Sequence, residues 1–154
     1  MNAAAEYSPS WREVAIKFFP ERAHLYAEPA ETLWSVLFDL HDAVLAAHRN
    51  GDQEALARIY AFAAWCHAQK DADPQLWTAA SAAFYEHLVD NPLTYREIPR
   101  RLSPEICAGM IPEFKDRLDN KERYPDDDAG SFAALARRFD EVHGTGFSSA
   151  EDMV

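Results

Sequence analysis

Two pairs of acidic and histidine side chains have a spacing that could hold a metal ion against a helix. Glu21 with His24, and Asp140 with His143, are each three residues apart, so both side chains of a pair share one helical face. A carboxylate-bridged metal centre needs two such pairs facing further inward carboxylates, and Glu21 follows a proline in an expected connection. His143 precedes Gly144, where a helix end favours a partial positive charge without a metal. We therefore expect ordinary, partly buried histidines and no cofactor, with a metal-dependent helical-bundle enzyme as the alternative.

The other histidines and the two cysteines indicate no catalytic centre. Cys66 and His67 would pair a thiol with a base, but neighbouring helical side chains point about 100° apart. His41 and His48 are two turns apart and fit the polar edge of a packed helix. The chain contains no glycine-rich phosphate loop and no CxxC, HExxH or GxSxG pattern. We accordingly predict a protein that is not an enzyme.

Three consecutive acids, Asp126–Asp128, resemble part of a calcium-binding loop. The loop glycine is displaced, and Arg137 stands where such a loop needs a glutamate as its twelfth residue. Acidic residues ahead of a helix that starts after Ser131 would instead stabilise the helix dipole. We interpret this run as the flank of a helix and not as an ion site.

The most informative polar cluster is Arg96, Arg100 and Arg101, in a chain with a large acidic excess. On a short helix Arg96 and Arg100 share a face, and their guanidiniums could hold a carboxylate or phosphate by paired hydrogen bonds. The simpler expectation is internal pairing with Glu97, Glu105 or other acids, since nearby carboxylates would neutralise the arginines first. The three arginines are therefore candidate contacts for a ligand or partner, with internal pairing as the favoured interpretation.

Three tryptophans, Trp34, Trp65 and Trp77, lie on consecutive expected helices. Large aromatic side chains with a polar edge are common both in cores and at interfaces. We expect most of them to be core residues. Trp77 comes early in its helix, one residue after the apolar Leu76, so we expect it to be partly exposed and include it among the candidate binding residues.

The spacing of apolar residues predicts the series of helices that must position these side chains. The first runs from Trp11 and ends before Pro20, whose ring does not fit a helix interior. The second opens at Glu28–Pro29, carries apolar residues from Leu33 to Val44 in steps of four, three and four, and ends at Asn50–Gly51.

The next two helices follow closely. Asp52 caps a helix that extends to about Lys70, and the short linker requires it to fold back on its predecessor as an antiparallel hairpin. Asp73–Pro74 opens another helix, which runs until Asn91–Pro92.

Caps, prolines and glycines mark the remaining helix boundaries. These are a capping box at Thr94 and Glu97, a start at Ser103, an internal Pro112, a start at Ser131 and a stop at Gly144. We expect one or two helical turns as far as Arg101, and a kink or break in the next helix at Pro112.

One stretch also resembles a known repeat. Asp73-Pro74-Gln75-Leu76-Trp77-Thr78-Ala79-Ala80-Ser81-Ala82-Ala83-Phe84 places an Asp-Pro cap before an apolar residue and a run of small residues that ends in a large apolar one. This order is similar to the second helix of a HEAT-type repeat, although Trp77 stands where that family usually has a basic residue. The alanines would let neighbouring helices approach to about 8 to 10 Å.

The resemblance covers these twelve residues closely and the two preceding helices loosely. It implies stacked antiparallel helical hairpins with a face suited to holding another protein, and it brings no catalytic residues. A fainter similarity to small uncharacterised bacterial helical proteins implies the same. No repeat period of about 35 to 45 residues recurs, so a repeat array is not indicated.

Composition agrees with a helical protein. The 154 residues include 27 alanines and 5 glycines, and alanine favours helices over strands. We predict an all-α fold of five or six helices, packed as stacked antiparallel hairpins or as an irregular bundle. Residues 11–143 would form one domain, between a flexible N-terminal arm, 1–10, and a flexible C-terminal tail, 144–154.

Charge limits the partners that the protein can have. The formal net charge of −11 disfavours nucleic acid and anionic lipid surfaces, and no apolar run is long enough to cross a membrane. Two widely spaced cysteines, without a recognisable secretion signal, indicate reduced thiols and a cytoplasmic protein.

We therefore predict a non-enzymatic protein-interaction module with an acidic surface, and one form of it would be an immunity-like inhibitor of a basic partner. Besides the metal enzyme, the remaining alternative is a regulatory module that binds an anionic small molecule through Arg96 and Arg100. The oligomeric state is left open.

Overall fold

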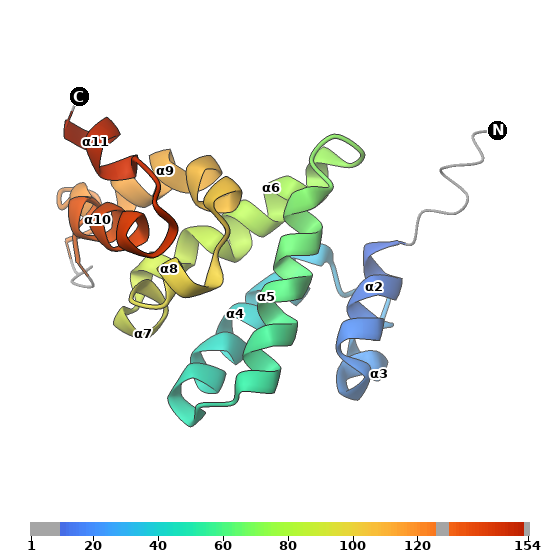
Figure 1. Ribbon diagram of the computed structural model, residues 1–154. Helices are drawn as coiled ribbons and strands as arrows, with labels where there is room; N and C mark the ends of the chain where they lie inside the picture. Colours follow the sequence, from blue (N-terminus) through green and yellow to red (C-terminus); the bar gives the residue numbers. More distant parts are fainter. Residues whose placement is uncertain (1–9, 126–129, 153–154) are drawn as a thin grey trace.

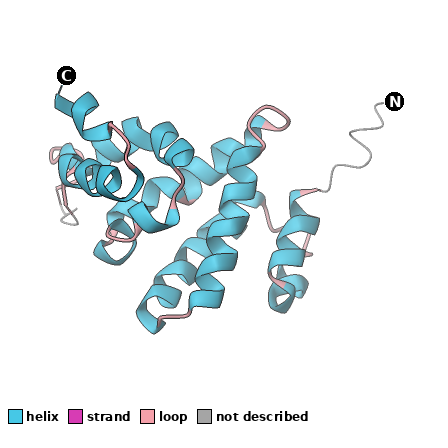
Figure 2. Ribbon diagram, in the orientation of Figure 1, coloured by secondary structure: helices cyan, strands magenta, loops and turns pink. Residues whose placement is uncertain are grey.

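The chain folds as an all-α protein. The computed structural model describes residues 10–125 and 130–152, and within these ranges the chain forms helices and connecting loops with no strand (Figure 2). The all-α prediction is therefore confirmed. The expectations for the N-terminal arm before residue 10, for Asp126–Asp128 and for the last two residues lie outside the described residues.

The described residues contain ten α-helices, more than the five or six that the sequence predicts. The difference comes from turns of four to six residues, which carry too few apolar positions to show a helical period. The longer helices are α2 (Trp11–Phe18), α4 (Leu33–Asn50), α5 (Gln53–Ala68), α6 (Pro74–Ala83), α9 (Pro104–Asp119) and α10 (Phe132–His143). The short ones are α3 (Ala23–Tyr26), α7 (Pro92–Tyr95), α8 (Ile98–Arg101), α11 (Phe147–Asp152) and the 3-10 helices η1 (Pro20–Arg22) and η2 (Tyr85–Asp90).

Helices α4, α5 and α6 form the centre of the molecule, and each packs against the other two (Figure 1). Helix α4 begins after Thr32 and not, as predicted, at Pro29, because the hydroxyls of Thr32 and Ser35 each accept the other residue's backbone N–H. At the other end Gly51, with φ of 65°, ends α4 and Asp52 caps α5, as the sequence predicts.

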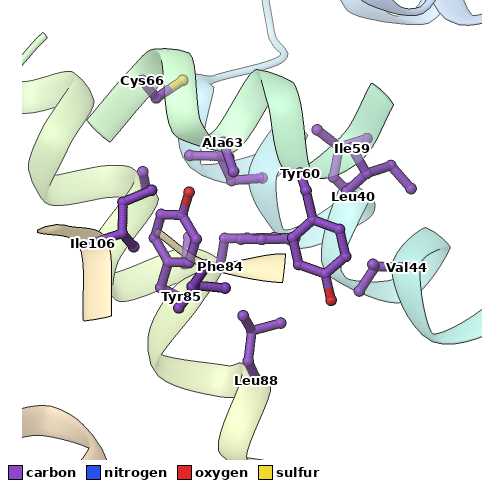
Figure 3. Packing of buried hydrophobic residues seen from close by; sticks show 14 of the residues in the cluster. Leu40, Val44, Ile59, Tyr60, Ala63, Cys66, Phe84, Tyr85, Leu88 and Ile106 are labelled. Carbon is purple, nitrogen blue, oxygen red and sulfur yellow. The ribbon is translucent and has the colours of Figure 1, made fainter. Parts of the chain in front are cut away.

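The helix predicted between Asp73 and Asn91 ends early. Helix α6 stops at Ala83, and the chain continues in the tighter winding of η2. This change lets Phe84, Tyr85 and Leu88 all point into the core, where each is at most 1% exposed (Figure 3). Burial of adjacent aromatic rings therefore overrides the α-helical period at this point.

The segment after η2 also departs from the prediction. The Thr94 hydroxyl is buried, and its one proton is shared between the carbonyl oxygens of Leu88 and Asn91. Glu97 makes no capping bond, so the predicted capping box is absent. Thr94 instead ties α7 to η2.

The last long helices keep their predicted ends. Pro112 lies inside α9, which continues through it without a break, so this proline does not divide the helix. Ser131 caps α10 and Gly144, with φ of 68°, ends it, as predicted. No helix of the described ranges combines the length and apolar character that a membrane span requires.

The segment predicted as a flexible tail, 144–154, contains helix α11. The Asp140 carboxylate holds its first turn, because it accepts the backbone N–H groups of Phe147 and Ser148, each at 2.9 Å, and the Thr145 hydroxyl at 2.5 Å. A single acid on α10 therefore caps the next helix, which the sequence pattern does not reveal.

One cluster of buried apolar side chains runs through the fold from Val14 in α2 to Phe139 in α10. Cys66 and Cys107 both lie in this core as free thiols. Burial raises the pKa of each thiol to about 12, so both are protonated and unreactive at neutral pH.

Candidate functional site

The predicted arginine cluster lies where α7 and α8 meet α10. Arg96 ends α7, and Arg100 and Arg101 form the last turn of α8, which packs against α10. Arg96 and Arg100 are exposed and Arg101 is half-buried. Across the described ranges no ion pair joins any of the three to a carboxylate, so the favoured pairing with Glu97 or Glu105 does not form.

Arg101 is fixed against the core. Its Nη2 donates to Oε1 of Gln53 at 2.9 Å, and its guanidinium lies 5.6 Å from the centre of the Tyr60 ring. The Tyr60 hydroxyl is 2.9 Å from Nε2 of His48. Burial lowers the pKa of His48, and the positive charges of Arg101 and Arg96 lower it further. Arg101 therefore anchors α8 to α5, while Arg96 and Arg100 stay at the surface.

Trp77 is partly exposed, as the sequence predicts. The residue is half-buried, and its indole N–H donates to Nε2 of His67 at 3.1 Å. Lys70 Nζ lies 4.7 Å from the ring centre. The polar edge and one face of Trp77 are therefore occupied within the chain, and its role as a partner contact stays a prediction.

The exposed aromatic residues lie on α4 instead. Trp34 is 43% exposed and Phe38, one turn later on the same side of the helix, is 47% exposed. The Phe38 ring lies 5.9 Å from the ring of His87 in η2. We call Trp34 and Phe38 the aromatic pair.

The sequence analysis did not identify the aromatic pair, although Trp34 has the same position relative to an apolar stripe as Trp77. Trp34 follows Leu33 of the apolar stripe just as Trp77 follows Leu76. An offset of one residue turns a side chain by about 100° from the core, but the offset does not say whether a neighbouring helix covers it. His67 and Lys70 cover Trp77, whereas no residue in the described ranges makes a hydrogen bond, a ring contact or a cation–π contact with Trp34.

A pocket of about 340 Å³ opens beside Trp34. Its walls come from the start of α2, the loop before α4 and the start of α6, and they include Trp11 as well as Trp34. Glu31 and Asp73 place two carboxylates at this pocket. It therefore combines indole rings with an acidic edge.

Arg12 also lines this pocket, but its N–H groups are directed at the backbone. The guanidinium donates to the carbonyl oxygens of Glu28 at 2.9 Å and Glu31 at 2.8 Å, and also to that of Tyr26. It lies 4.6 Å from the centre of the Trp11 ring. Arg12 thus fixes the loop that forms one wall of the pocket.

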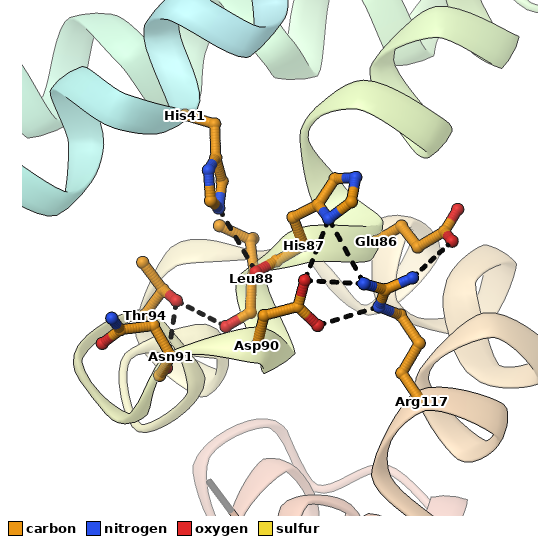
Figure 4. A network of polar contacts seen from close by, with 8 residues as sticks. All are labelled: His41, Glu86, His87, Leu88, Asp90, Asn91, Thr94 and Arg117. Atoms are coloured by element: carbon orange, nitrogen blue, oxygen red, sulfur yellow. Dashed lines mark hydrogen bonds and ion pairs between the residues drawn. The ribbon is translucent and has the colours of Figure 1, made fainter. Parts of the chain in front are cut away.

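A second polar cluster joins η2 to α9 (Figure 4). Arg117 binds both carboxylate oxygens of Asp90, at 2.8 and 2.7 Å, and Oε1 of Glu86 at 2.9 Å. His87 Nδ1 lies 2.9 Å from Asp90, and His41 Nε2 lies 3.2 Å from the His87 carbonyl oxygen. Burial would raise the pKa of Asp90, but the bonds from His87 and Arg117 lower it. The charges of this cluster satisfy one another, so it acts as a structural clamp.

The predicted metal pairs are used for other contacts. Glu21 pairs with Arg58 at 2.8 Å, and His24 is exposed on α3. Asp140 caps α11, while His143 Nε2 lies 2.6 Å from a carbonyl oxygen of α8. In the part of the chain that the structure describes, no three histidine, cysteine or acidic side chains converge as metal ligands.

The chain was compared with known protein families. Residues 12–110 match the family model described as "Domain of unknown function (DUF7674)". The matched region contains the aromatic pair and the arginines of α7 and α8, and it ends within α9. Searches of curated proteins and of solved structures find no match.

Proposed function

The chain belongs to the DUF7674 family of domains of unknown function, and we propose that it is a non-enzymatic module that binds a basic protein partner. The observation that carries this proposal is the exposed aromatic pair on α4. Single exposed apolar residues are ordinary on protein surfaces. Two large aromatic rings lie one turn apart, and one of them, Trp34, lines a pocket together with Trp11, which is the composition of an interface hot spot.

The charge around the aromatic pair indicates the chemistry of the partner. Asp42 is exposed one turn beyond Phe38, and Glu31 and Asp73 line the pocket beside Trp34. The chain as a whole carries a formal net charge of −11. A partner with apolar anchors surrounded by lysine or arginine side chains would complement this face and would be steered toward it at low salt.

The proposal includes a HEAT-like stack of antiparallel hairpins as the scaffold. The two-residue link between α4 and α5, and the packing of both against α6, support this arrangement. Ala79, Ala80 and Ala83 of α6 are fully buried, which permits close helix approach. Such a stack is rigid, so the aromatic pair would be presented without rearrangement on binding.

The setting that we propose is the cytoplasm, where two free cysteines remain reduced. An immunity-like inhibitor that covers a basic enzyme is one form that such a module could take. Its charge and its size support a binding role.

The test is comparative capture of partners from a lysate of the native host. The bait is the full chain as wild type, as Trp34→Ala/Phe38→Ala, and as Val142→Ala, which removes a 55% exposed side chain on α10. We expect one basic protein to bind wild type and the Val142 variant and to be lost from the double variant. Raising the salt from about 0.15 M to about 1 M should weaken capture, since the Debye length falls from about 8 to about 3 Å.

Equal capture by wild type and the double variant would contradict the proposed interface. A captured partner with an acidic surface would contradict the proposed charge complementarity.

A further inference from the structure

Five arginines lie on two short segments that meet where α8 packs against α10. The chain carries 26 acidic and 15 basic side chains, yet five of the basic ones fall within two short segments, 96–101 and 137–138. Packing of α8 against α10 brings these segments together (Figure 1). The five residues are Arg96, Arg100, Arg101, Arg137 and Arg138.

Arg138 connects the two segments directly. Its Nη2 donates to the backbone carbonyl oxygen of Arg96, and its guanidinium lies 5.6 Å from the centre of the Tyr95 ring. The positive charge of Arg138 is therefore held beside the end of α7. Because the Arg138 side chain is already ordered, it would lose little conformational entropy on binding a ligand.

The side chains of Arg96 and Arg100 are available. Both are exposed, and neither makes a hydrogen bond, an ion pair or a ring contact with another described residue. The backbone dihedral angles of Arg96 and Glu97 are in the helical region. Arg96 and Arg100, which are four residues apart, therefore lie on the same side of this segment.

A bound anion would relieve the repulsion between these exposed like charges. Two guanidiniums at a spacing of four residues repel each other, and the fixed Arg138 adds a third positive charge. Glu97 supplies one negative charge in the same segment without forming an ion pair to the arginines. Within residues 96–101 three arginines and one glutamate leave an excess of two positive charges, which a multiply charged anion would balance.

We propose that Arg96, Arg100 and Arg138 form a binding site for a multivalent oxyanion, a phosphate or a polycarboxylate. The planar guanidinium presents parallel N–H donors that match the oxygens of either group. The site lies on other elements than the aromatic pair, so it does not depend on the proposed function.

The proposal is tested by calorimetric titration of the full chain with pyrophosphate and, separately, with citrate, each against sodium chloride of the same ionic strength. We expect saturable binding of at least one of the two. Arg100→Ala should weaken that binding about tenfold or more, and Arg96→Ala/Arg100→Ala should abolish it, because each removes charge-assisted hydrogen bonds. Lys17→Ala, which removes an exposed cation on α2, should leave the affinity unchanged.

Thermal unfolding of each variant shows that it is folded. Its melting temperature should equal that of wild type, because the exposed side chains that are removed make no contacts with other described residues. Binding of pyrophosphate alone would identify a phosphate ligand, and binding of citrate alone a polycarboxylate. The proposal is overturned if neither anion binds, if the double variant keeps the wild-type affinity, or if Lys17→Ala weakens binding as much as Arg100→Ala does.

Discussion

The indole N–H of Trp77 donates a hydrogen bond to Nε2 of His67 at 3.1 Å and so joins α6 to the end of α5. Because Nε2 accepts this bond, the imidazole is neutral and carries its proton on Nδ1. His67 is buried, and this burial lowers its pKa below the usual value of 6.5. Protonation at Nε2 would place two donors against each other.

Acidification should therefore destabilise the fold through His67. As the pH falls below about 6.5, His67 of the unfolded chain takes up a proton before His67 of the folded chain does. The contribution of neutral His67 to stability is therefore complete above that pH, and it is lost as the pH falls toward the lower pKa of the folded state. Urea unfolding between about pH 7.5 and about pH 5 measures the slope. His67→Gln should reduce the slope, while His24→Gln, at an exposed site, should not. An unchanged slope in His67→Gln would refute this role.

The Ser81→Ala variant should be more stable than wild type. The Ser81 Oγ in α6 is buried and has no hydrogen-bond partner among the described residues. Removing an unsatisfied hydroxyl and introducing a better helix former should add about 0.5 to 1 kcal/mol to the free energy of unfolding. Thr78→Ala, at an exposed position of the same helix, should change it by less than about 0.5 kcal/mol. A loss of stability in Ser81→Ala would show that the hydroxyl has a partner.

Arg117→Met should destabilise the protein by about 2 to 3 kcal/mol, because it leaves Asp90 and Glu86 without their counter-charge. The Arg117 side chain is 13% exposed, whereas the Arg123 side chain, which pairs with Asp116, is 67% exposed. Arg123→Met should therefore cost less than about 1 kcal/mol. Denaturant unfolding of both variants gives the comparison, and equal losses of unfolding free energy would show that the clamp between η2 and α9 contributes no more than an exposed ion pair.

Asp140→Asn should release α11 from α10. Burial would raise the pKa of Asp140, but its bonds to Ser148, Thr145 and the backbone N–H of Phe147 lower it to about 2. The carboxylate therefore holds α11 above the unfolded pKa of about 3.9, and the attachment is lost as the pH falls toward about 2. In wild type at neutral pH, hydrogen exchange should show protected Phe147 and Ser148 amides.

In Asp140→Asn these amides should exchange faster, while Glu141→Gln, next to it and exposed, should keep the wild-type rates. Equal protection in both variants would show that Asp140 does not hold the helix.

The sequence predicts those parts of the fold that depend on local chemistry. Gly51 and Gly144 end helices, and Asp52 and Ser131 begin them, because a cap is decided by the residue and its immediate neighbours. The end of α6 at Ala83 could not be predicted in this way. It depends on the core space that Phe84 and Tyr85 fill together, and residues of other helices define that space.

The same limit applies to the candidate sites. The arginines of α7 and α8 were found because charge and spacing are visible in a sequence. Their missing ion pairs and the approach of Arg138 depend on how α8 packs against α10. Trp34 and Trp77 have the same offset from an apolar stripe, and the packing of α5 against α6 covers Trp77 alone.

The proposed interface is tested most directly by oxidative footprinting of Trp34 in the complex with the captured basic partner. We expect Trp34 and Phe38 to lose reactivity in the complex, while the exposed Val142 on α10 keeps the reactivity of the free protein. Unchanged reactivity of Trp34 on partner binding would show that the contact surface lies elsewhere and would contradict the assignment of α4 as the binding face.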